Sequence, residues 1–167
     1  MALGATLAGA LLIWCPVEFD GPTLAVWNAS ASAPIGLYRV SPTGSIGVGD
    51  RVLVDAEPSV VALLSARGYV PEGVPLIKTV AAVAPSRVCR DGLAISIDGR
   101  FVARARSADR AGRPLPAWGG CRILGPDQVF LLTADVPDSL DGRYFGPTER
   151  RSIRGRVTPF WTRRTGP

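Results

Sequence analysis

Short runs of alternating apolar and polar residues follow one another along this chain, and they predict a mainly β fold. Strands are expected at Leu24–Trp27, Gly49–Asp55, Leu76–Val83 and Val129–Thr133. The dipeptide Asp98–Gly99 suits a two-residue turn, so Leu93–Ile97 and Phe101–Ala105 are expected to form a hairpin around it. One short helix is expected at Ser59–Gly68, with Ser59 as its N-cap and Gly68 at its end.

An apolar run without any charge opens the chain and spans residues 1–17, and Glu18 is the first ionisable side chain. The run is slightly shorter than the roughly 20 residues that cross a bilayer, and it lacks the positive start of a signal peptide. A retained membrane anchor, a cleaved export signal and a buried core helix are the three interpretations. The anchor is favoured because the run has no polar face, which gives residues 1–17 as an apolar helix and 18–167 as one domain.

Histidine is absent from the 167 residues, which excludes Ser-His-Asp and Cys-His catalysis and histidine-ligated metals. Of the 19 basic side chains, Lys78 is the only lysine. Arginine stays protonated at usable pH, so Lys78 is the only strongly basic side chain that can become a neutral amine.

The formal net charge of +5 is concentrated near the C-terminus, where residues 141–167 hold seven arginines against Asp141 and Glu149. No nucleic-acid-binding motif and no basic groove interleaved with aromatic residues accompanies them, so nucleic acid is not an expected partner. A solvated or membrane-facing basic tail is expected instead.

Two cysteines, Cys89 and Cys121, flank the predicted hairpin. In an exported domain they are expected to form a disulfide, whereas in a cytosolic one they would be two reduced thiols. A zinc site is not expected, because two thiols without histidine do not supply four ligands.

The segment Asn28–Tyr38 places two serines two residues apart, just before a proline. Proline disfavours helix at the residue before it, so Ser32 is expected in a turn with its side chain presented. Lys78 shares a strand face with Leu76 and Val80, where burial would lower its pKa and suit it to general-base work. Turn-forming serines and an edge-strand lysine that reaches water are the more common cases, and the local sequence alone favours them; it permits a Ser/Lys dyad without requiring it.

Four blocks, in order, resemble the signal peptidase I superfamily and, within it, the conjugative-transfer peptidases of the TraF type. They read S-A-P-I-G-L-Y (Ser32–Tyr38), G-D-R-V-L-V (Gly49–Val54), L-I-K-T-V-A-A (Leu76–Ala82) and S-L-D-G-R-Y-F-G (Ser139–Gly146). Each block alone is a weak signal, but four in order after an apolar N-terminus are specific. Ala33 stands where general signal peptidases carry methionine, which favours the TraF branch. The resemblance implies a signal-peptidase-like catalytic β domain.

The resemblance also implies residue roles. Ser32 would be the nucleophile and Lys78 the general base that takes its proton. The hydroxyl of Ser30 would join the backbone N–H of Ser32 in the oxyanion hole.

Three further residues would support that site. Ser139 would orient the lysine amine, and Asp141 and Arg143 would form a charged pair beside it. Gly142 departs from the serine usual between them, which removes one supporting hydrogen bond.

The implied protein is a membrane-anchored serine endopeptidase on the periplasmic side of a bacterial cytoplasmic membrane, without a cofactor or metal. It would cleave exported precursors such as conjugative pilin after small residues, through an acyl-enzyme that water or a peptide amine resolves; the amine would cyclise the pilin. Its partners would be the precursor, the membrane and conjugative-transfer or type IV secretion components. The alternative is an anchored component of such an apparatus without catalytic activity.

Overall fold

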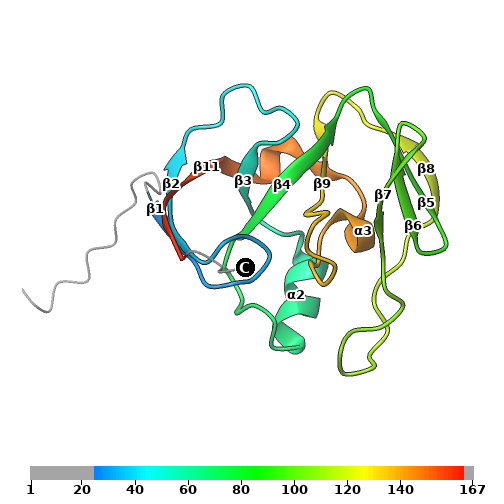
Figure 1. Cartoon of the computed structure of the whole chain (residues 1–167), viewed down its shortest axis with the longest axis horizontal. Helices are drawn as coiled ribbons and strands as arrows, with labels where there is room; N and C mark the ends of the chain where they lie inside the picture. Colours follow the sequence, from blue (N-terminus) through cyan, green and yellow to red (C-terminus); the bar gives the residue numbers. More distant parts are fainter. Residues whose placement is uncertain (1–24, 164–167) are drawn as a thin grey trace, which may run out of the picture.

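A computed structural model describes residues 25–163, and the element labels below follow Figure 1. The strands are β1 (Ala25–Asn28), β2 (Gly36–Ser41), β3 (Arg51–Val54), β4 (Leu76–Val83), β5 (Arg87–Asp91), β6 (Ala94–Ile97), β7 (Arg100–Arg104), β8 (Gly120–Ile123), β9 (Gln128–Leu131), β10 (Thr148–Glu149) and β11 (Ile153–Thr162). The helices are α2 (Pro58–Ala66) and α3 (Gly142–Phe145), with a 3-10 turn at Arg150–Ser152. The mainly β prediction is therefore confirmed.

The helix predicted for residues 1–17 lies outside the described residues. Between residues 25 and 163, no helix combines the length and the apolar character that crossing a membrane requires.

Two antiparallel sheets make up the domain. The larger has the order β1-β2-β11-β3-β4-β9-β10, and the smaller has the order β7-β6-β5-β8. Strand β4 runs from the middle of the larger sheet toward the smaller one, and α3 lies between the two sheets (Figure 1). This arrangement brings α3, which lies within the sequence block Ser139–Gly146, next to the strand that carries Lys78.

Three groups of apolar side chains form the core. One, around Val52, Val80 and Leu131, packs within the larger sheet, and a second, around Phe130 and Ile95, joins it to the smaller sheet. A third surrounds Tyr38, behind the serine segment. Burial of these side chains is the main driving force for folding.

The helix and hairpin agree with the sequence, with small shifts. Helix α2 begins at Pro58 rather than after a Ser59 cap, because the fixed φ of proline suits the first helical position and its missing N–H has no helical partner there. Gly68, at φ +69°, follows the helix end. In the β6–β7 turn, Asp98 and Gly99 both have positive φ, as the predicted two-residue turn requires.

Strand β9 ends earlier than predicted. Its ladder stops at Leu131, and the N–H of Thr133 donates instead to the carboxylate of Asp141 at 3.0 Å. A side chain outside the strand, eight residues further on, therefore takes up this backbone N–H, which the alternation of the strand itself does not reveal.

The prediction of a basic tail near the C-terminus is wrong for residues 153–162. They form β11, which pairs with β2 on one side and β3 on the other. Ile153, Gly155 and Val157 are buried, while Arg154 points outward between them. The strand was not predicted because its arginines hide the alternation of buried and exposed positions that is typical of a strand. Strands β2, β5 and β8 were also not predicted.

The two cysteines are joined. Cys89 on β5 pairs with Cys121 on β8 in the sheet register, and their sulfurs form a disulfide. The bond ties β5, from which Arg90 reaches α3 as described below, to β8, which follows Trp118.

Candidate active site

The loop between β1 and β2 carries the serines. Residues 31–32 form a turn, as predicted, and the buried side chain of Asn28 holds it. The Asn28 amide donates to the backbone oxygens of Ser30, Ala33 and Pro34 at 2.9, 2.9 and 3.1 Å. Its oxygen accepts from the N–H of Ser30 at 3.1 Å and from the Ser30 hydroxyl at 2.9 Å. One side chain at the end of β1 therefore fixes the whole loop.

The two serine hydroxyls are neighbours. Ser30 Oγ lies 2.9 Å from Ser32 Oγ. Tyr38, buried on β2, donates from its hydroxyl to the Pro34 oxygen at 2.8 Å, which anchors the far end of the loop. Both serines thus occupy one small, fixed region at the surface of the larger sheet.

Lys78 lies in the middle of β4 and is 6% exposed. Its Nζ donates to Ser139 Oγ at 3.1 Å, across a sequence separation of 61 residues. Burial lowers the pKa of Lys78 to about 8, against a smaller opposing effect of Asp141 and a further lowering by Arg143. A substantial fraction of this amine is therefore neutral near pH 8, and its lone pair can accept a proton.

Asp141 and Arg143 form a fully buried ion pair beside the lysine. Arg143 Nε lies 2.8 Å from Asp141 Oδ1, and a second contact joins Nη2 to Oδ2 at 3.1 Å. Arg143 also donates to the oxygens of Thr133 and Pro137, and Asp141 accepts from two backbone N–H groups. Because each charge has several partners, the pair is rigid as well as neutral overall.

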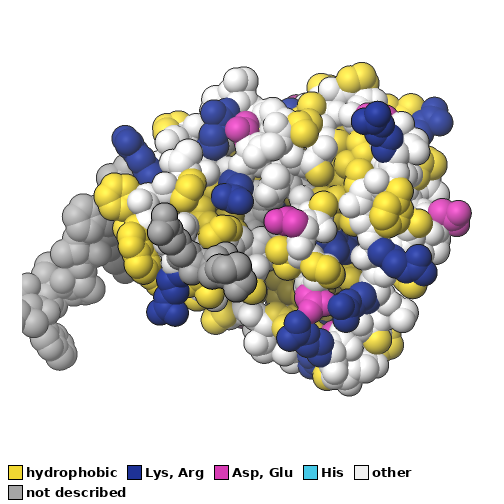
Figure 2. Space-filling view, viewed as in Figure 1, with side chains coloured by type: hydrophobic (Ala, Val, Ile, Leu, Met, Phe, Trp, Pro, Cys, Tyr) yellow, Lys and Arg dark blue, Asp and Glu magenta, His cyan; other side chains and the backbone are white. Residues whose placement is uncertain are grey.

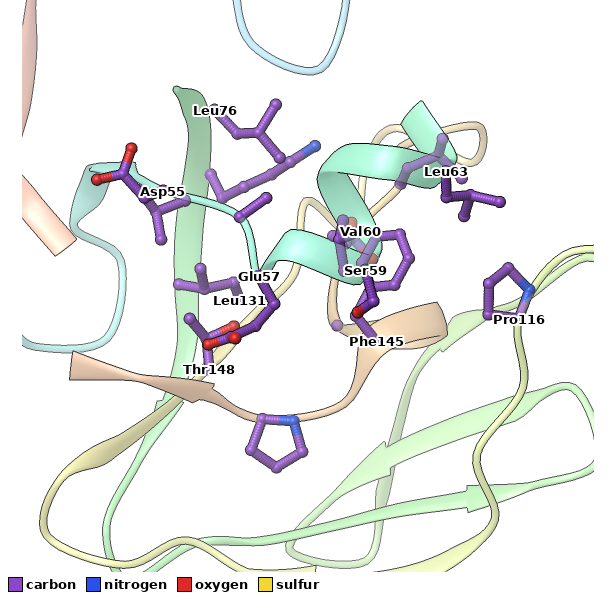
Figure 3. Close-up of a pocket in the computed structure, with 17 residues that line it drawn as sticks. Asp55, Glu57, Ser59, Val60, Leu63, Leu76, Pro116, Leu131, Phe145 and Thr148 are labelled. Carbon is purple, nitrogen blue, oxygen red and sulfur yellow. The ribbon is translucent and has the colours of Figure 1, made fainter. Parts of the chain in front are cut away.

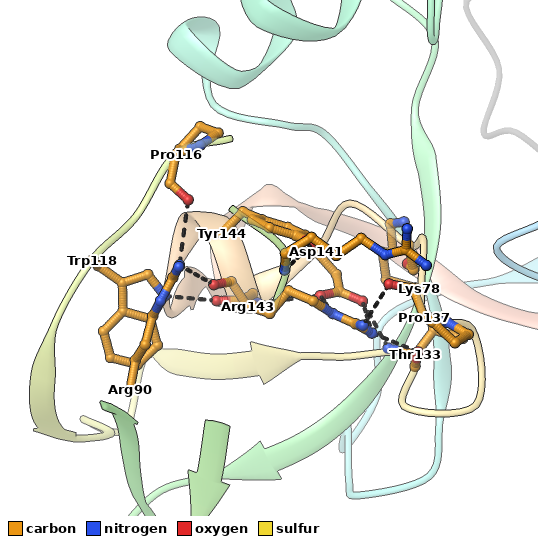
Figure 4. Close-up of polar contacts among 12 residues, drawn as sticks. Lys78, Arg90, Pro116, Trp118, Thr133, Pro137, Asp141, Arg143 and Tyr144 are labelled. Atoms are coloured by element: carbon orange, nitrogen blue, oxygen red, sulfur yellow. Dashed lines mark hydrogen bonds and ion pairs between the residues drawn. The ribbon is translucent and has the colours of Figure 1, made fainter. Parts of the chain in front are cut away.

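The smaller sheet braces this pair from behind (Figure 4). Arg90 on β5 donates to the backbone oxygen of Arg143 at 2.6 Å, and Trp118 donates from Nε1 to the oxygen of Gly142 at 2.9 Å. The Arg90 side chain is buried, so its guanidinium is committed to such backbone oxygens. The two hydrogen bonds from Arg90 and Trp118 hold the backbone of helix α3 in place.

Gly142, which departs from the family pattern, sits where no larger residue fits. A Cβ atom there would come 2.6 Å from the oxygen of Leu131 and 2.7 Å from the ring of Phe130. The glycine therefore allows α3 to pack directly against β9.

Ser32 and Lys78 open onto one cleft of about 450 Å³, whose lining also includes Ser30 and Ser139. The Lys78 amine bonds to Ser139, and the Ser32 hydroxyl contacts Ser30. Among the hydrogen bonds of residues 25–163, none joins the Lys78 amine directly to the Ser32 hydroxyl. Such bonds tighten in many enzymes only when substrate binds.

A second cavity of about 410 Å³ reaches Lys78 beside α2 (Figure 3). Leu76, Lys78 and Leu140 line both cavities. Among the described residues, no group of three or more His, Cys, Asp or Glu side chains is placed to hold a metal ion.

Sequence reasoning missed three residues that position this site: Asn28, Arg90 and Trp118. An Asn just after a strand and before a serine turn is a known turn-forming signal, so Asn28 could have been found. The other two act through contacts more than 20 residues away, which no local pattern carries.

A family model described as signal peptidase, peptidase S26, matches residues 1–161. The chain belongs to this family. A plasmid transfer protein TraF from Escherichia coli is 30% identical over 97% of this chain and 96% of its own length. A second Escherichia coli TraF is 33% identical over 81% of each chain. The resemblance to TraF-type signal peptidases is therefore confirmed.

Among solved structures, a signal peptidase I from Enterococcus faecalis V583 aligns with 71% of this chain and all of its own, at 17% identity and a TM-score of 0.39.

Proposed function

We propose that this signal peptidase family member is a serine endopeptidase in which Ser32 is the nucleophile and Lys78 the general base. The supporting observation is the single cleft onto which the paired serine hydroxyls and the buried lysine amine open. Family membership supports the peptidase class.

In the proposed reaction, Ser32 Oγ attacks the scissile carbonyl while neutral Lys78 takes the hydroxyl proton. The Ser30 hydroxyl and the backbone N–H of Ser32 stabilise the oxyanion. Lys78 then gives its proton to the leaving amine, and an acyl-enzyme on Ser32 remains. Lys78 then takes a proton from water or from a peptide amine, which attacks the acyl carbon. The bond from that carbon to Ser32 Oγ breaks, and Lys78 returns the proton to Oγ. Water gives a free carboxyl group, and the amine gives a cyclic product. Ser139 holds the lysine amine toward Ser32, and the Asp141–Arg143 pair keeps that region fixed.

The proposed substrate is an exported precursor such as a conjugative pilin, cleaved after small residues. The relatives are plasmid transfer proteins, which supports a conjugation context with transfer or type IV secretion components as partners.

We also propose that residues 1–17 anchor the domain 18–167 to the cytoplasmic membrane, with the catalytic side in the periplasm. Trp27 on β1 and Trp161 on β11 stack with their ring centroids 5.9 Å apart, and Phe160, next to Trp161 in sequence, is 76% exposed. Exposed aromatic residues of this kind are typical of membrane interfaces. The disulfide fits an oxidising compartment. Fractionation and protease accessibility of intact spheroplasts test the placement; a protease-protected, cytoplasmic domain would contradict it.

Co-expression with a pilin precursor tests the reaction. Mass analysis should show cleavage, or loss of water on cyclisation, with the wild type and with the control Ser65→Ala, whose serine is exposed on α2. Ser32→Ala and Lys78→Ala should each leave the precursor uncut while still folding. Normal processing by either variant would rule out the dyad, and no processing by the wild type would favour the role of a non-catalytic anchored component.

A further inference from the structure

Arginines line the wall of the cleft that faces the serine loop. They come from the segment between β7 and β8, which supplies Arg106, Arg110 and Arg113 to the same cleft as Ser32. In Figure 2, dark-blue side chains gather beside a magenta patch at the end of the molecule where this segment projects. The acidic residues of the cleft rim are Asp109 and Asp138.

The carboxylate oxygens of Asp109 already accept several hydrogen bonds. It accepts from the Tyr69 hydroxyl at 2.5 Å, from Arg113 Nε at 2.7 Å and from the N–H groups of Ala111 and Arg113, both at 2.9 Å. Arg67, just after α2, completes the group at 3.4 Å. This cluster ties the α2 end to the β7–β8 segment, and its groups face one another rather than a ligand.

Asp138 differs because two arginines share one carboxylate at the surface. Arg106 Nη2 lies 2.9 Å from Asp138 Oδ1, and Arg110 contacts the other oxygen through Nε at 3.1 Å and through Nη2. The hydrogen bond from Arg110 lowers the pKa of Asp138, so the carboxylate stays ionised and the trio carries one net positive charge.

Both arginines of this trio line the cleft and keep N–H donors that Asp138 does not use. The side chains of Arg106 and Arg110 are 51% and 85% exposed. A guanidinium has five N–H donors in a fork that matches a carboxylate, and one aspartate cannot use all those of two arginines. Arg113, by contrast, is already bound to Asp109 and Tyr69.

The trio is also close to the chemistry. Asp138 directly precedes Ser139, whose hydroxyl accepts from the Lys78 amine. A peptide whose scissile bond lies at Ser32 therefore passes these arginines within the same cleft, and an extended chain advances only about 3.3 Å per residue.

We infer that the cleft prefers peptides with a carboxylate a few residues from the scissile bond, and that Arg106 and Arg110 bind that carboxylate. This rests on the proposed function, since it names the substrate class of the same site. The carboxylate can belong to an Asp or Glu side chain or to a free C-terminus.

Matched synthetic peptides test this. An alanine-rich peptide library with one position varied among Glu, Gln and Lys, each with a free or amidated C-terminus, is incubated with the enzyme and analysed by mass spectrometry. We expect kcat/KM for the Glu peptides to exceed that for the Gln peptides about tenfold, and the ratio to shrink at high salt. If the free C-terminus is the ligand, amidation rather than the Glu-to-Gln change lowers the rate.

Variants assign the preference. In Arg106→Gln and Arg110→Gln the Glu-to-Gln ratio, or the free-to-amide ratio, should fall toward one. Arg100→Gln, an exposed arginine in the β6–β7 hairpin outside this cleft, should keep the wild-type ratio. Equal rates for all peptides with the wild type, or a ratio unchanged in the Arg106→Gln/Arg110→Gln double variant, would overturn the inference.

Binding separates this inference from the catalytic proposal. Fluorescence anisotropy with Ser32→Ala and labelled versions of the same peptides should show the same preference without cleavage. A preference in binding with no cleavage by the wild type would uphold the inference and reject the peptidase; cleavage without any preference would do the reverse.

Discussion

The serine half and the lysine half of the site are built differently. The serine loop is short and near the surface, and its hydrogen bonds span two to six residues around Asn28. Lys78 is buried, and its surroundings come from Ser139 and the Asp141–Arg143 pair. Behind them lie Arg90 on β5 and Trp118 in the segment just before β8. In the proposed mechanism, a serine nucleophile must be accessible to a peptide, whereas a lysine base must be buried to become neutral.

This difference predicts that changes around the lysine act on both stability and proton affinity, while changes around the serines act mainly on turnover.

The largest expected effect is that of Asp141→Asn. It leaves the Arg143 guanidinium, 1% exposed, without its counter-charge, and such losses cost about 3–5 kcal/mol in the free energy of unfolding. The matched control is Asp55→Asn, which breaks a half-exposed pair with Arg154 and should cost about 0–1 kcal/mol. Chemical denaturation measures both; equal costs would mean that the lysine half is not specially rigid.

Ser30→Ala tests the serine half. Loss of one oxyanion donor typically lowers turnover about 10²–10³-fold, and the exposed contact with Ser32 contributes little to folding. Steady-state kinetics on a cleaved precursor, beside thermal melts, should show a slow enzyme with nearly wild-type stability. Unchanged turnover would remove Ser30 from the oxyanion hole.

Asn28→Ala should lie between these extremes. It leaves the backbone oxygens of Ser30 and Ala33 and the N–H of Ser30 without this partner, which costs about 1–3 kcal/mol. The Pro34 oxygen keeps its hydrogen bond from Tyr38. Turnover should fall too, because the positions of both serines depend on this side chain. A variant that loses stability but keeps full turnover would show that the loop geometry does not matter to catalysis.

Trp118→Phe gives the smallest effect, about 1 kcal/mol, since one hydrogen bond to Gly142 is lost while a ring still packs on Phe130. Looser packing of α3 should let water nearer to Lys78, so the pKa in the rate profile should move up toward the ordinary lysine value. As a control, Phe101→Leu, at an exposed position on β7, should leave the rate profile unchanged.

The same contrast explains what the sequence could predict. The turn at Ser32 follows from Pro34, and β4 matches its predicted bounds, because both depend on neighbouring residues. Strand β11 was missed because its partners, β2 and β3, supply the apolar neighbours that its arginine-rich pattern lacks. The residue roles at Ser139 and Asp141 came from family resemblance, since no local rule links them to a lysine some 60 residues away.

The central claim is that Lys78 is a base because it is buried. It is the only lysine in the chain, so protein labelled with ¹³C-lysine gives one side-chain amine signal, which NMR can follow with pH. We predict a pKa of about 8, with activity rising as pH increases through that value, since a lowered pKa makes the neutral, proton-accepting form available there. A titration midpoint near the ordinary value of 10.5, with activity indifferent to pH around 8, would contradict the account.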